Sequence, residues 1–178
     1  MLRTELLSSE NSSGLESFYC GDDDLDDFLK SDALKLFDEH VCVTFLAFLE
    51  TDDIDNEFVG FISLVADALT LDSSEKLPDI PLTVVPALKI ARLAVSSDAR
   101  SRFKGIGTTL VRKAFLDGLD LTHSVAARFL TVDAYPNAIS FYEKLGFQKN
   151  LAQTYKKRRR NCSMRLDLFG ELPAWLDI

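Results

Sequence analysis

The sequence predicts a mixed α/β fold, and three observations carry this prediction. Apolar runs rich in β-branched and aromatic residues have the length of buried strands, most clearly at 41–49 and 58–66. A long segment at 107–123 carries apolar residues at helical spacing. From residue 88 onward, strands and helices alternate in a β–α–β–α–β pattern, which favours a sheet with helices packed against it.

The first half of the chain predicts one strand, one helix and one hairpin. Residues 3–7 form a weak first strand, and the acidic residues 22–24 mark a helix start. The runs 41–49 and 58–66 flank an acidic turn, so we expect them to pair as a hairpin in the middle of a sheet. The helix before them carries apolar residues at helical spacing, namely Leu25, Phe28, Leu29, Ala33, Leu36 and Phe37.

The second half begins with a loop at 72–86 that contains three prolines. Pro136 is expected to begin a helix that runs to about Leu145, because proline suits the first turn of a helix. Gly146 is expected to end this helix. The remaining expected elements are a strand at 88–95, the helix at 107–123, a strand at 129–134, and a closing hairpin of 147–151 with 163–168.

Length, charge and cysteine content narrow the class of protein. The 178 residues are expected to form a single domain, residues 1–178. A formal net charge of −8 argues against general attraction to nucleic acid or to an anionic membrane. Three cysteines without a paired spacing indicate reduced thiols and a cytoplasmic location. The sequence shows neither a membrane-spanning run nor a signal-peptide pattern.

The turn Arg102-Phe103-Lys104-Gly105-Ile106-Gly107 is the most informative feature of the chain. It joins a predicted strand to a predicted helix. Glycines allow backbone N–H groups to approach an anion closely, and the start of a helix favours negative charge. Two glycines alone would indicate only a tight turn, but the flanking strand and helix favour a phosphate site.

Three ordered blocks resemble the GNAT superfamily of acetyl-CoA-dependent N-acetyltransferases. Residues 91–95, followed by Arg102-x-x-Gly105-x-Gly107, are similar to its pyrophosphate loop. Residues 129–134 are similar to its next strand, and 138–147 to its Ala-x-x-x-Tyr-x-x-x-Gly-Phe block. The resemblance implies the GNAT fold over about 41–168. This fold is a central mixed, mostly antiparallel sheet of six to seven strands, splayed at the cofactor site and flanked by helices.

The resemblance also implies acetyl-CoA as the cofactor. N–H groups of residues 104–108 would hold its pyrophosphate, and Arg102 and Lys104 would add positive charge. Main-chain groups of residues 93–95 would pair with the pantetheine arm like an extra strand. No metal is expected. The cofactor-binding candidates are Leu93, Ala94, Val95, Arg102, Phe103, Lys104, Gly105, Ile106, Gly107, Thr108, Ala138 and Phe141.

Tyr142 is the candidate catalytic residue that the resemblance implies. A positioned phenol can donate a proton to a leaving thiolate, because the pKa values of thiol and phenol differ by only about one to two units. The alternative is a tyrosine that only packs in the core. A main-chain N–H of residues 93–95 would polarise the thioester carbonyl.

The general base is the point where this sequence departs from the family. Many relatives carry a glutamate on the strand before the pyrophosphate loop, and Arg92 stands at the equivalent position here. Asp133 is a candidate base, or else a solvated strand end. His40 and His123 are expected to be ordinary helix-end or surface residues. An acceptor that needs no base fits best, and the α-amine of an aminoacyl ester has a pKa below about 8.

A second resemblance, to the toxin branch of the superfamily, indicates the same acceptor. Residues 18–33, which include Phe-Tyr-Cys-Gly-Asp, are similar to the N-terminal block of that branch, and residues 80–95 are similar to its proline-bearing loop and strand. These toxins acetylate aminoacyl-tRNA and are restrained by an antitoxin protein. The resemblance therefore implies aminoacyl-tRNA as the substrate and an antitoxin as a partner.

The charge of the chain opposes this interpretation except at one run. The run consists of Lys156, Lys157, Arg158, Arg159 and Arg160, and with Arg92 it gives the candidate substrate or RNA contacts. A solvated turn is the alternative for such a run. An acetyltransferase for a small amine or a protein N-terminus, and a non-catalytic acetyl-CoA-binding module, stay open as other functions. Whether the chain forms a homodimer also stays open.

Overall fold

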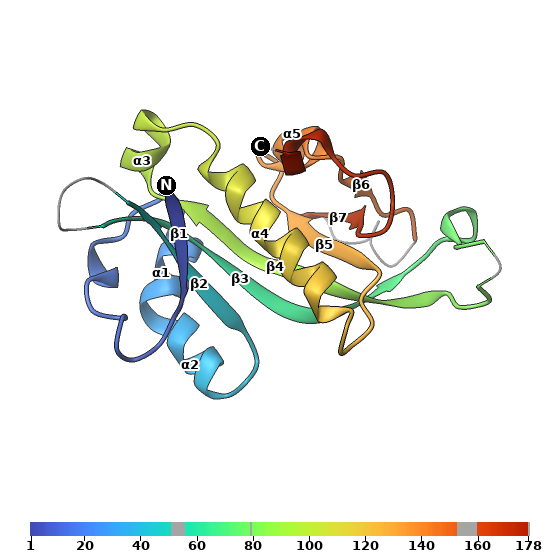
Figure 1. Ribbon diagram of the computed structural model, residues 1–178, viewed down its shortest axis with the longest axis horizontal. Helices are drawn as coiled ribbons and strands as arrows, with labels where there is room; N and C mark the ends of the chain where they lie inside the picture. Colours follow the sequence, from blue (N-terminus) through green and yellow to red (C-terminus); the bar gives the residue numbers. More distant parts are fainter. Residues whose placement is uncertain (51–55, 79, 153–159, 178) are drawn as a thin grey trace. The chain divides into compact units, whose positions relative to one another are not determined.

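The computed structural model describes residues 1–50, 56–78, 80–152 and 160–177. Its strands form one sheet in the order β1-β2-β3-β4-β5-β7-β6 (Figure 1). The strands of this described part are β1 (Leu2–Leu6), β2 (Val43–Leu49), β3 (Glu57–Thr70), β4 (Val84–Val95), β5 (Phe129–Ala134), β6 (Gln148–Lys149) and β7 (Cys162–Asp167).

The sheet is mixed and mostly antiparallel, as predicted. β4 and β5 are parallel, with Ala87–Ile90 beside Phe129–Val132. The pairs β1–β2, β2–β3, β5–β7 and β6–β7 are antiparallel, and the last of these confirms the predicted closing hairpin. The predicted splay at the cofactor site stays a prediction.

The helices of the described part are mostly short. The α-helices are α1 (Asp23–Asp27), α2 (Ala33–Asp38), α3 (Ser97–Arg102), α4 (Ile106–Leu121) and α5 (Ile139–Lys144). A π-helical turn, η2 (Phe28–Asp32), joins α1 to α2. Three 3₁₀ turns complete the set: η1 (Leu15–Ser17), η3 (Ser73–Glu75) and η4 (Ala174–Asp177).

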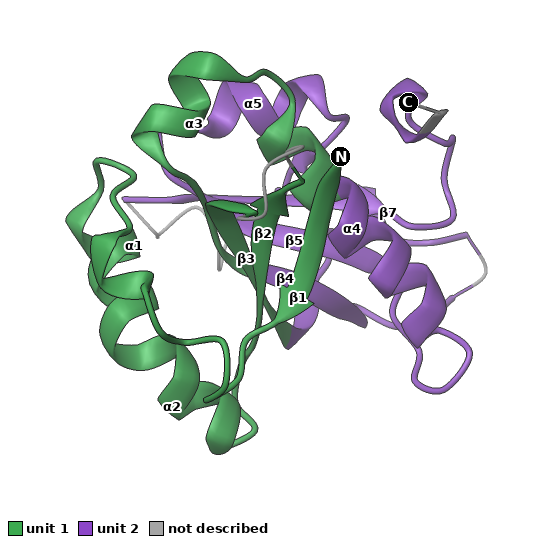
Figure 2. Ribbon diagram, turned by 60° about the vertical axis from the view of Figure 1, so that its left-hand side comes forward, with its two compact units in different colours: residues 1–65, 91–111 green, residues 66–90, 112–178 purple. Residues whose placement is uncertain are grey.

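The chain forms two compact units, which are coloured separately in Figure 2. Unit 1 comprises residues 1–65 and 91–111, and unit 2 comprises residues 66–90 and 112–178. The sequence ranges of β3, β4 and α4 each extend from one unit into the other. The single domain expected from the sequence stays a prediction.

In unit 1 the N-terminal helical segment, which consists of α1, η2 and α2 (residues 23–38), covers an apolar core. Asp22 caps α1, because its Oδ1 accepts from the N–H of Leu25 at 3.3 Å. The buried Asp26 carboxylate accepts from the N–H of Cys20 at 2.9 Å and fixes the entry to the helix. Leu46, Phe61 and Ala94 from three strands pack in the same cluster as Phe28 and Leu29.

Two features of unit 1 differ from the sequence expectation. The helix predicted from residue 22 to about 37 is interrupted, because the N–H of Ala33 donates to the carbonyl of Phe28 and makes a π turn. Helix α3 was not predicted, since its sequence Ser-Asp-Ala-Arg-Ser-Arg has no apolar repeat. The Ser96 side chain caps it instead, accepting from the N–H of Ala99 at 3.2 Å.

Unit 2 corrects two predicted boundaries. Strand β4 begins at Val84 rather than Leu88, and η3 lies inside the predicted loop 72–86, stabilised by a capping box between Asp72 and Glu75. Helix α5 begins at Ile139 rather than Pro136. The N–H of Ala138 donates to the carbonyl of Tyr135 at 2.9 Å, which makes Pro136 part of a preceding turn.

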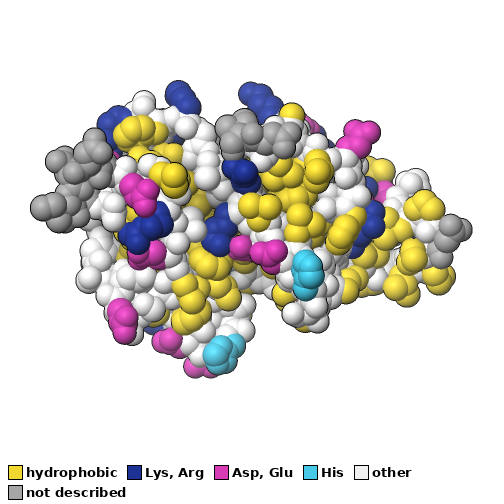
Figure 3. All heavy atoms as spheres, viewed as in Figure 1, with side chains coloured by type: hydrophobic (Ala, Val, Ile, Leu, Met, Phe, Trp, Pro, Cys, Tyr) yellow, Lys and Arg dark blue, Asp and Glu magenta, His cyan; other side chains and the backbone are white. Residues whose placement is uncertain are grey.

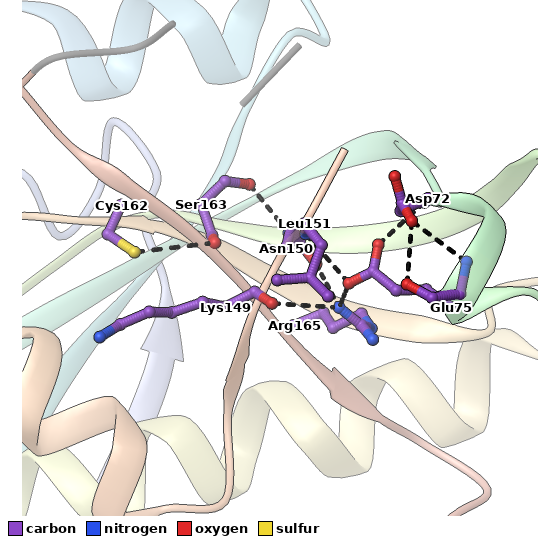
Figure 4. A network of polar contacts seen from close by, with 9 residues as sticks. Asp72, Glu75, Lys149, Asn150, Leu151, Cys162, Ser163 and Arg165 are labelled. Atoms are coloured by element: carbon purple, nitrogen blue, oxygen red, sulfur yellow. Dashed lines mark hydrogen bonds and ion pairs between the residues drawn. The ribbon is translucent and has the colours of Figure 1, made fainter. Parts of the chain in front are cut away.

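A buried polar network ties η3 to β6 and β7 in unit 2 (Figure 4). The Glu75 carboxylate pairs with the Arg165 guanidinium at 2.6 Å, and the two side chains are only 4% and 12% exposed. Glu75 also accepts from the N–H of Leu151 at 3.0 Å, and Arg165 donates to Asn150 Oδ1 at 2.9 Å. A cavity of about 520 Å³ lies beside this network.

The three cysteines are free, as predicted. Cys20 and Cys42 are buried, and Cys162 is half-buried. No helix of the described residues is long and apolar enough to cross a membrane.

Candidate active site

The predicted pyrophosphate loop is the junction between α3 and α4 in unit 1. Gly105 has a φ of +86°, which lies in the region that favours glycine. The N–H of Thr109 donates to the Gly105 carbonyl at 2.9 Å and closes the first turn of α4. The N–H groups of residues 106–108 precede that bond, so the helix itself offers them no acceptor. This arrangement suits an anion at the start of α4.

The two glycines of the loop differ in their roles. A Cβ at Gly105 would meet no atom within 4 Å, so the turn needs glycine for its backbone angles and leaves open space beside it. Gly107 lies in the first turn of α4 and is not among the glycines with positive φ. Phe103 and Lys104, between α3 and Gly105, are exposed.

Arg102 is held by carboxylates of unit 1. Its guanidinium donates to Asp98 Oδ2 at 2.6 and 3.0 Å and also to Glu57. Hydrogen bonds to Glu57 and then to Asp98 raise the pKa of Arg102, so its charge is permanent. A phosphate would have to compete with both carboxylates for this side chain, whereas the N–H groups of α4 have no such competitor within the helix.

Strand β4 brings the predicted pantetheine-binding residues to the loop. Leu93 and Val95 are half-buried, and Ala94 is buried. Gly60 of β3 lies against this segment so closely that a Cβ there would be 2.5 Å from the Ala94 carbonyl oxygen. Gly60 was not among the predicted site residues, although a glycine within an apolar strand is a signal of close backbone approach.

A bulge in β3 lies next to this close approach. Ala47 of β2 is opposite Gly60 and Phe48 is opposite Phe58, so Val59 is the extra residue. The carbonyl of Val59 accepts from the N–H of Ser96 at 2.8 Å, directly after β4 ends. The bulge and Gly60 therefore fix the end of β4 from which the loop starts.

Tyr142 lies in α5 of unit 2 and is 5% exposed. Its ring packs edge-on against Phe141 and Phe147, at centroid distances of 5.0 and 5.2 Å. Burial raises the pKa of the Tyr142 phenol, so the hydroxyl keeps its proton well beyond neutral pH. The phenol is therefore in the protonated form that a proton donor needs, and the raised pKa also makes it a weaker acid than a free tyrosine.

The backbone around Tyr142 fixes the end of α5. The N–H of Tyr142 donates to the carbonyl of Ala138 at 3.2 Å, and the carbonyl of Tyr142 accepts from Leu145 and Phe147 at 3.0 Å each. Gly146, at a φ of +85°, turns the chain out of the helix as the sequence predicts.

The candidate base Asp133 is held in an ion pair, and the two histidines lie at exposed helix ends. The carboxylate of Asp133 is bound to Lys89 Nζ at 2.7 Å. His123 lies in the turn after α4, where its Nδ1 is 3.2 Å from the Asp120 carbonyl, and His40 lies in the turn after α2. Both histidines are exposed helix-end residues, as expected. The described residues contain no cluster suited to a metal ion.

Arg92 of β4 lies in unit 1 beside α1. Its guanidinium carbon is 5.3 Å from the centroid of the Phe28 ring, and its Nη1 donates to the Ala91 carbonyl at 2.9 Å. Its Nη2 is 4.0 Å from Asp24 Oδ2, which is the outer limit of an ion pair.

The predicted RNA-contacting run lies largely outside the described residues. Lys156 to Arg159 are not described, and Arg160 is exposed. On the face shown in Figure 3, some basic side chains lie next to acidic ones. The contact of this run with RNA stays a prediction.

The fold and the loop agree with the family that the sequence matches. Residues 41–149 match the acetyltransferase (GNAT) domain, and the chain belongs to this family of acetyltransferases. The match confirms the predicted superfamily. The match begins at residue 41, after the N-terminal helical segment.

The chain is similar over most of its length to several known structures. A tyrosine-to-phenylalanine variant of KacT has a TM-score of 0.79 at 21% identity, with 94% of this chain and 95% of that chain covered. AtaT complexed with acetyl-methionyl-tRNAfMet has a TM-score of 0.77 at 22% identity, with 94% and 95% covered. An AtaT toxin variant bound to acetyl-CoA and the C-terminus of the antitoxin AtaR has a TM-score of 0.73 at 19% identity, with 94% and 93% covered.

Proposed function

We propose that this chain transfers the acetyl group of acetyl-CoA to the α-amine of aminoacyl-tRNA, and that it is a toxin restrained by an antitoxin protein. The observation that carries the proposal is the likeness to AtaT in complex with acetyl-methionyl-tRNAfMet over 94% of this chain. That likeness extends beyond residues 41–149, which any acetyltransferase of the family would share.

The loop in unit 1 fits acetyl-CoA. The N–H groups of residues 106–108 and the open space beside Gly105 suit the pyrophosphate. The main chain of residues 93–95, fixed in place through Gly60, suits the amide-rich pantetheine arm. Acetyl-CoA supplies an acetyl group activated as a thioester. The N–H groups of the chain orient it and stabilise negative charge on the carbonyl oxygen.

Tyr142 supplies the proton that the reaction needs on sulfur. Its hydroxyl stays protonated because burial raises the pKa of the phenol. When the amine nitrogen forms its bond to the carbonyl carbon and the bond to sulfur breaks, Tyr142 Oη gives its proton to the sulfur and regains one from water. The ammonium proton that the acceptor loses goes to water, so the products are an N-acetyl amide and a free thiol.

The absence of a free base among the described candidates supports an acceptor whose amine is already neutral. Asp133 is bound to Lys89, and Arg92 replaces the glutamate of many relatives. A lysine side chain, with a pKa near roughly 10.4, would be almost fully protonated at pH 7. The α-amine of an aminoacyl ester offers far more of its neutral form and needs no base to activate it.

Several further features belong to this proposal. Aminoacyl-tRNA is a cytoplasmic substrate, so we place the protein in the cytoplasm. The basic run 156–160 would neutralise RNA phosphates in a chain whose net charge is −8. Homodimer formation is compatible with this function, and it is tested by the mass of the protein in solution.

A small cationic amine is the second candidate acceptor. The net charge of −8 would steer such a substrate toward the protein. A module that binds acetyl-CoA without transferring the acetyl group is the third possibility, and the presence of Tyr142 together with the loop 102–107 argues against it.

The test measures thiol release and acetylated product with three acceptors: methionyl-tRNA, spermidine and a lysine-containing peptide. The proposal predicts transfer to methionyl-tRNA alone, at a rate that falls with increasing salt. A variant with all five basic residues of 156–160 replaced by glutamine should bind tRNA more weakly and with a flatter salt dependence. Transfer to spermidine alone would establish the second candidate. If no acceptor causes thiol release, the third candidate is established.

A further inference from the structure

The charge of Arg92 is balanced less closely than the charges of three other arginines of the described residues. Arg102, Arg128 and Arg165 each lie within 2.7 Å of a carboxylate oxygen. The carboxylate paired with Arg92, Asp24, lies at 4.0 Å and is 65% exposed, so water screens most of this interaction. Arg92 is therefore a weakly neutralised cation.

The structure also holds this cation in a fixed position. The guanidinium lies over the Phe28 ring at 5.3 Å, and the Phe28 ring stacks on Phe61 of β3 at 5.9 Å. Nη1 is bound to the Ala91 carbonyl, whereas Nε is buried with no hydrogen-bond partner in the described residues. With 38% of its side chain exposed, Arg92 remains accessible to a ligand.

The position of Arg92 in the sheet relates it to the acetyl-transfer site. It immediately precedes residues 93–95 of β4, which are the candidates for binding the pantetheine arm. Arg92 contacts α1 and η2, and Ala94, two residues further along the strand, packs in the cluster that contains Phe28. Both side chains therefore face the N-terminal helical segment, since alternate residues of a strand share a face.

We propose that Arg92 binds an anionic group of the acceptor, and that this group is the phosphodiester nearest the aminoacyl end of the RNA. The inference rests on the proposed function and adds a residue that selects the substrate. A fixed, weakly neutralised guanidinium is suited to a phosphodiester oxygen. The same charge repels an ammonium group, so Arg92 disfavours polyamines and protonated lysine.

The acidic helix α1 makes this role testable. Asp23, Asp24 and Asp27 are exposed on it, and without Arg92 they would favour a cationic acceptor. The preference for a phosphate-bearing acceptor should therefore depend on this one side chain.

The experiment compares two acceptors that carry the same amino acid. Methionyl-CpA has one phosphodiester, and methionyl-adenosine has none. The wild-type protein should prefer methionyl-CpA in kcat/KM. Arg92→Gln should lower kcat/KM for methionyl-CpA by about 10- to 100-fold, mainly through KM, because a hydrogen bond to a charged group contributes about 1.5–3 kcal/mol. Methionyl-adenosine should change by less than about threefold, and Arg92→Lys should restore part of the loss.

Controls separate a specificity role from a structural one. Arg3→Gln removes an arginine of β1 that is paired with Glu5 and should leave both acceptors unchanged. Acetyl-CoA affinity and the unfolding midpoint of Arg92→Gln should match those of the wild type. Equal losses with both acceptors, or no loss with either, would overturn the inference while the proposed function stands. Transfer by the wild type to neither methionyl acceptor would overturn the proposed function and the inference with it.

Discussion

Gly60→Ala tests how β3 positions the cofactor-binding segment of β4. The new Cβ would lie 2.5 Å from the Ala94 carbonyl oxygen and 3.2 Å from Val95 Cα, and both are backbone atoms that no rotamer change can move. To reach an ordinary contact of 3.4 Å, the two strands must separate locally by about 0.9 Å. Overpacking of this kind costs about 1–3 kcal/mol, offset in part by about 0.4–1 kcal/mol from the stiffer unfolded chain.

We therefore expect Gly60→Ala to lower the free energy of unfolding by about 1–2 kcal/mol. A displacement near 1 Å in a positioning segment costs about 100-fold in rate. We therefore expect kcat to fall by about 100-fold, which corresponds to about 2.7 kcal/mol in the activation free energy. Urea unfolding and thiol-release kinetics measure the two effects.

Gly118→Ala in α4 is the matched control for Gly60→Ala. Its Cβ would meet only the flexible Cδ atoms of Leu168, at 3.2 and 3.3 Å, and alanine favours a helix by about 1 kcal/mol. We expect its stability to be equal to or higher than that of the wild type. Wild-type stability and turnover in Gly60→Ala would refute the reasoning about the close approach.

Three further predictions concern the loop, a buried thiol and the polar network. Gly105→Ala and Gly14→Ala both place alanine at a φ near +90°, so each should lower the free energy of unfolding in urea by a similar amount, about 1–2 kcal/mol. Calorimetry should show weaker acetyl-CoA binding only for Gly105→Ala. Equal acetyl-CoA affinities of the two variants would contradict the role of the loop in binding the cofactor. Burial, followed by the hydrogen bond to Asp26, raises the pKa of Cys20 from 9.0 to about 11. The contribution of this thiol to stability is complete below pH 9 and is lost as the pH rises to 11, by at most about 2–3 kcal/mol. Cys20→Ala should flatten this part of the stability–pH profile, and an unchanged profile would contradict the role given to Cys20. Glu75→Ala leaves Arg165 buried without its carboxylate and should lower the free energy of unfolding by about 3–5 kcal/mol; a loss below 1 kcal/mol would show that the pair contributes little.

The sequence predicted the elements with strong periodic patterns. Strand β5, the helix after the loop, the central β2–β3 hairpin and the closing hairpin all appear close to their expected bounds. The misses share a cause, because local hydrogen bonds decided them rather than apolar periodicity. The Ser96 cap created α3, the turn at Pro136 delayed α5, and the π turn at Phe28 interrupted the first helix.

The candidate site shows a similar division. The sequence placed Gly105 in a glycine-bearing turn at the start of a helix and Tyr142 in a partly apolar cluster, and the structure has both features. It did not anticipate that Asp98 and Glu57 hold Arg102, since these contacts join residues distant in the chain or on a helix that was not predicted. The close approach of Gly60 to Ala94 likewise depends on how the backbones of β3 and β4 pack, which the sequence does not show.

The rate of acetyl transfer by Tyr142→Phe tests the central claim most directly. The account predicts that methionyl-tRNA mixed with acetyl-CoA and the wild type gives acetyl-methionyl-tRNA by mass analysis. With Tyr142→Phe the single-turnover rate should fall by at least about 100-fold, while acetyl-CoA affinity stays unchanged, because the variant lacks only the proton donor. An undiminished rate in Tyr142→Phe, with the same acetylated product, would contradict the account.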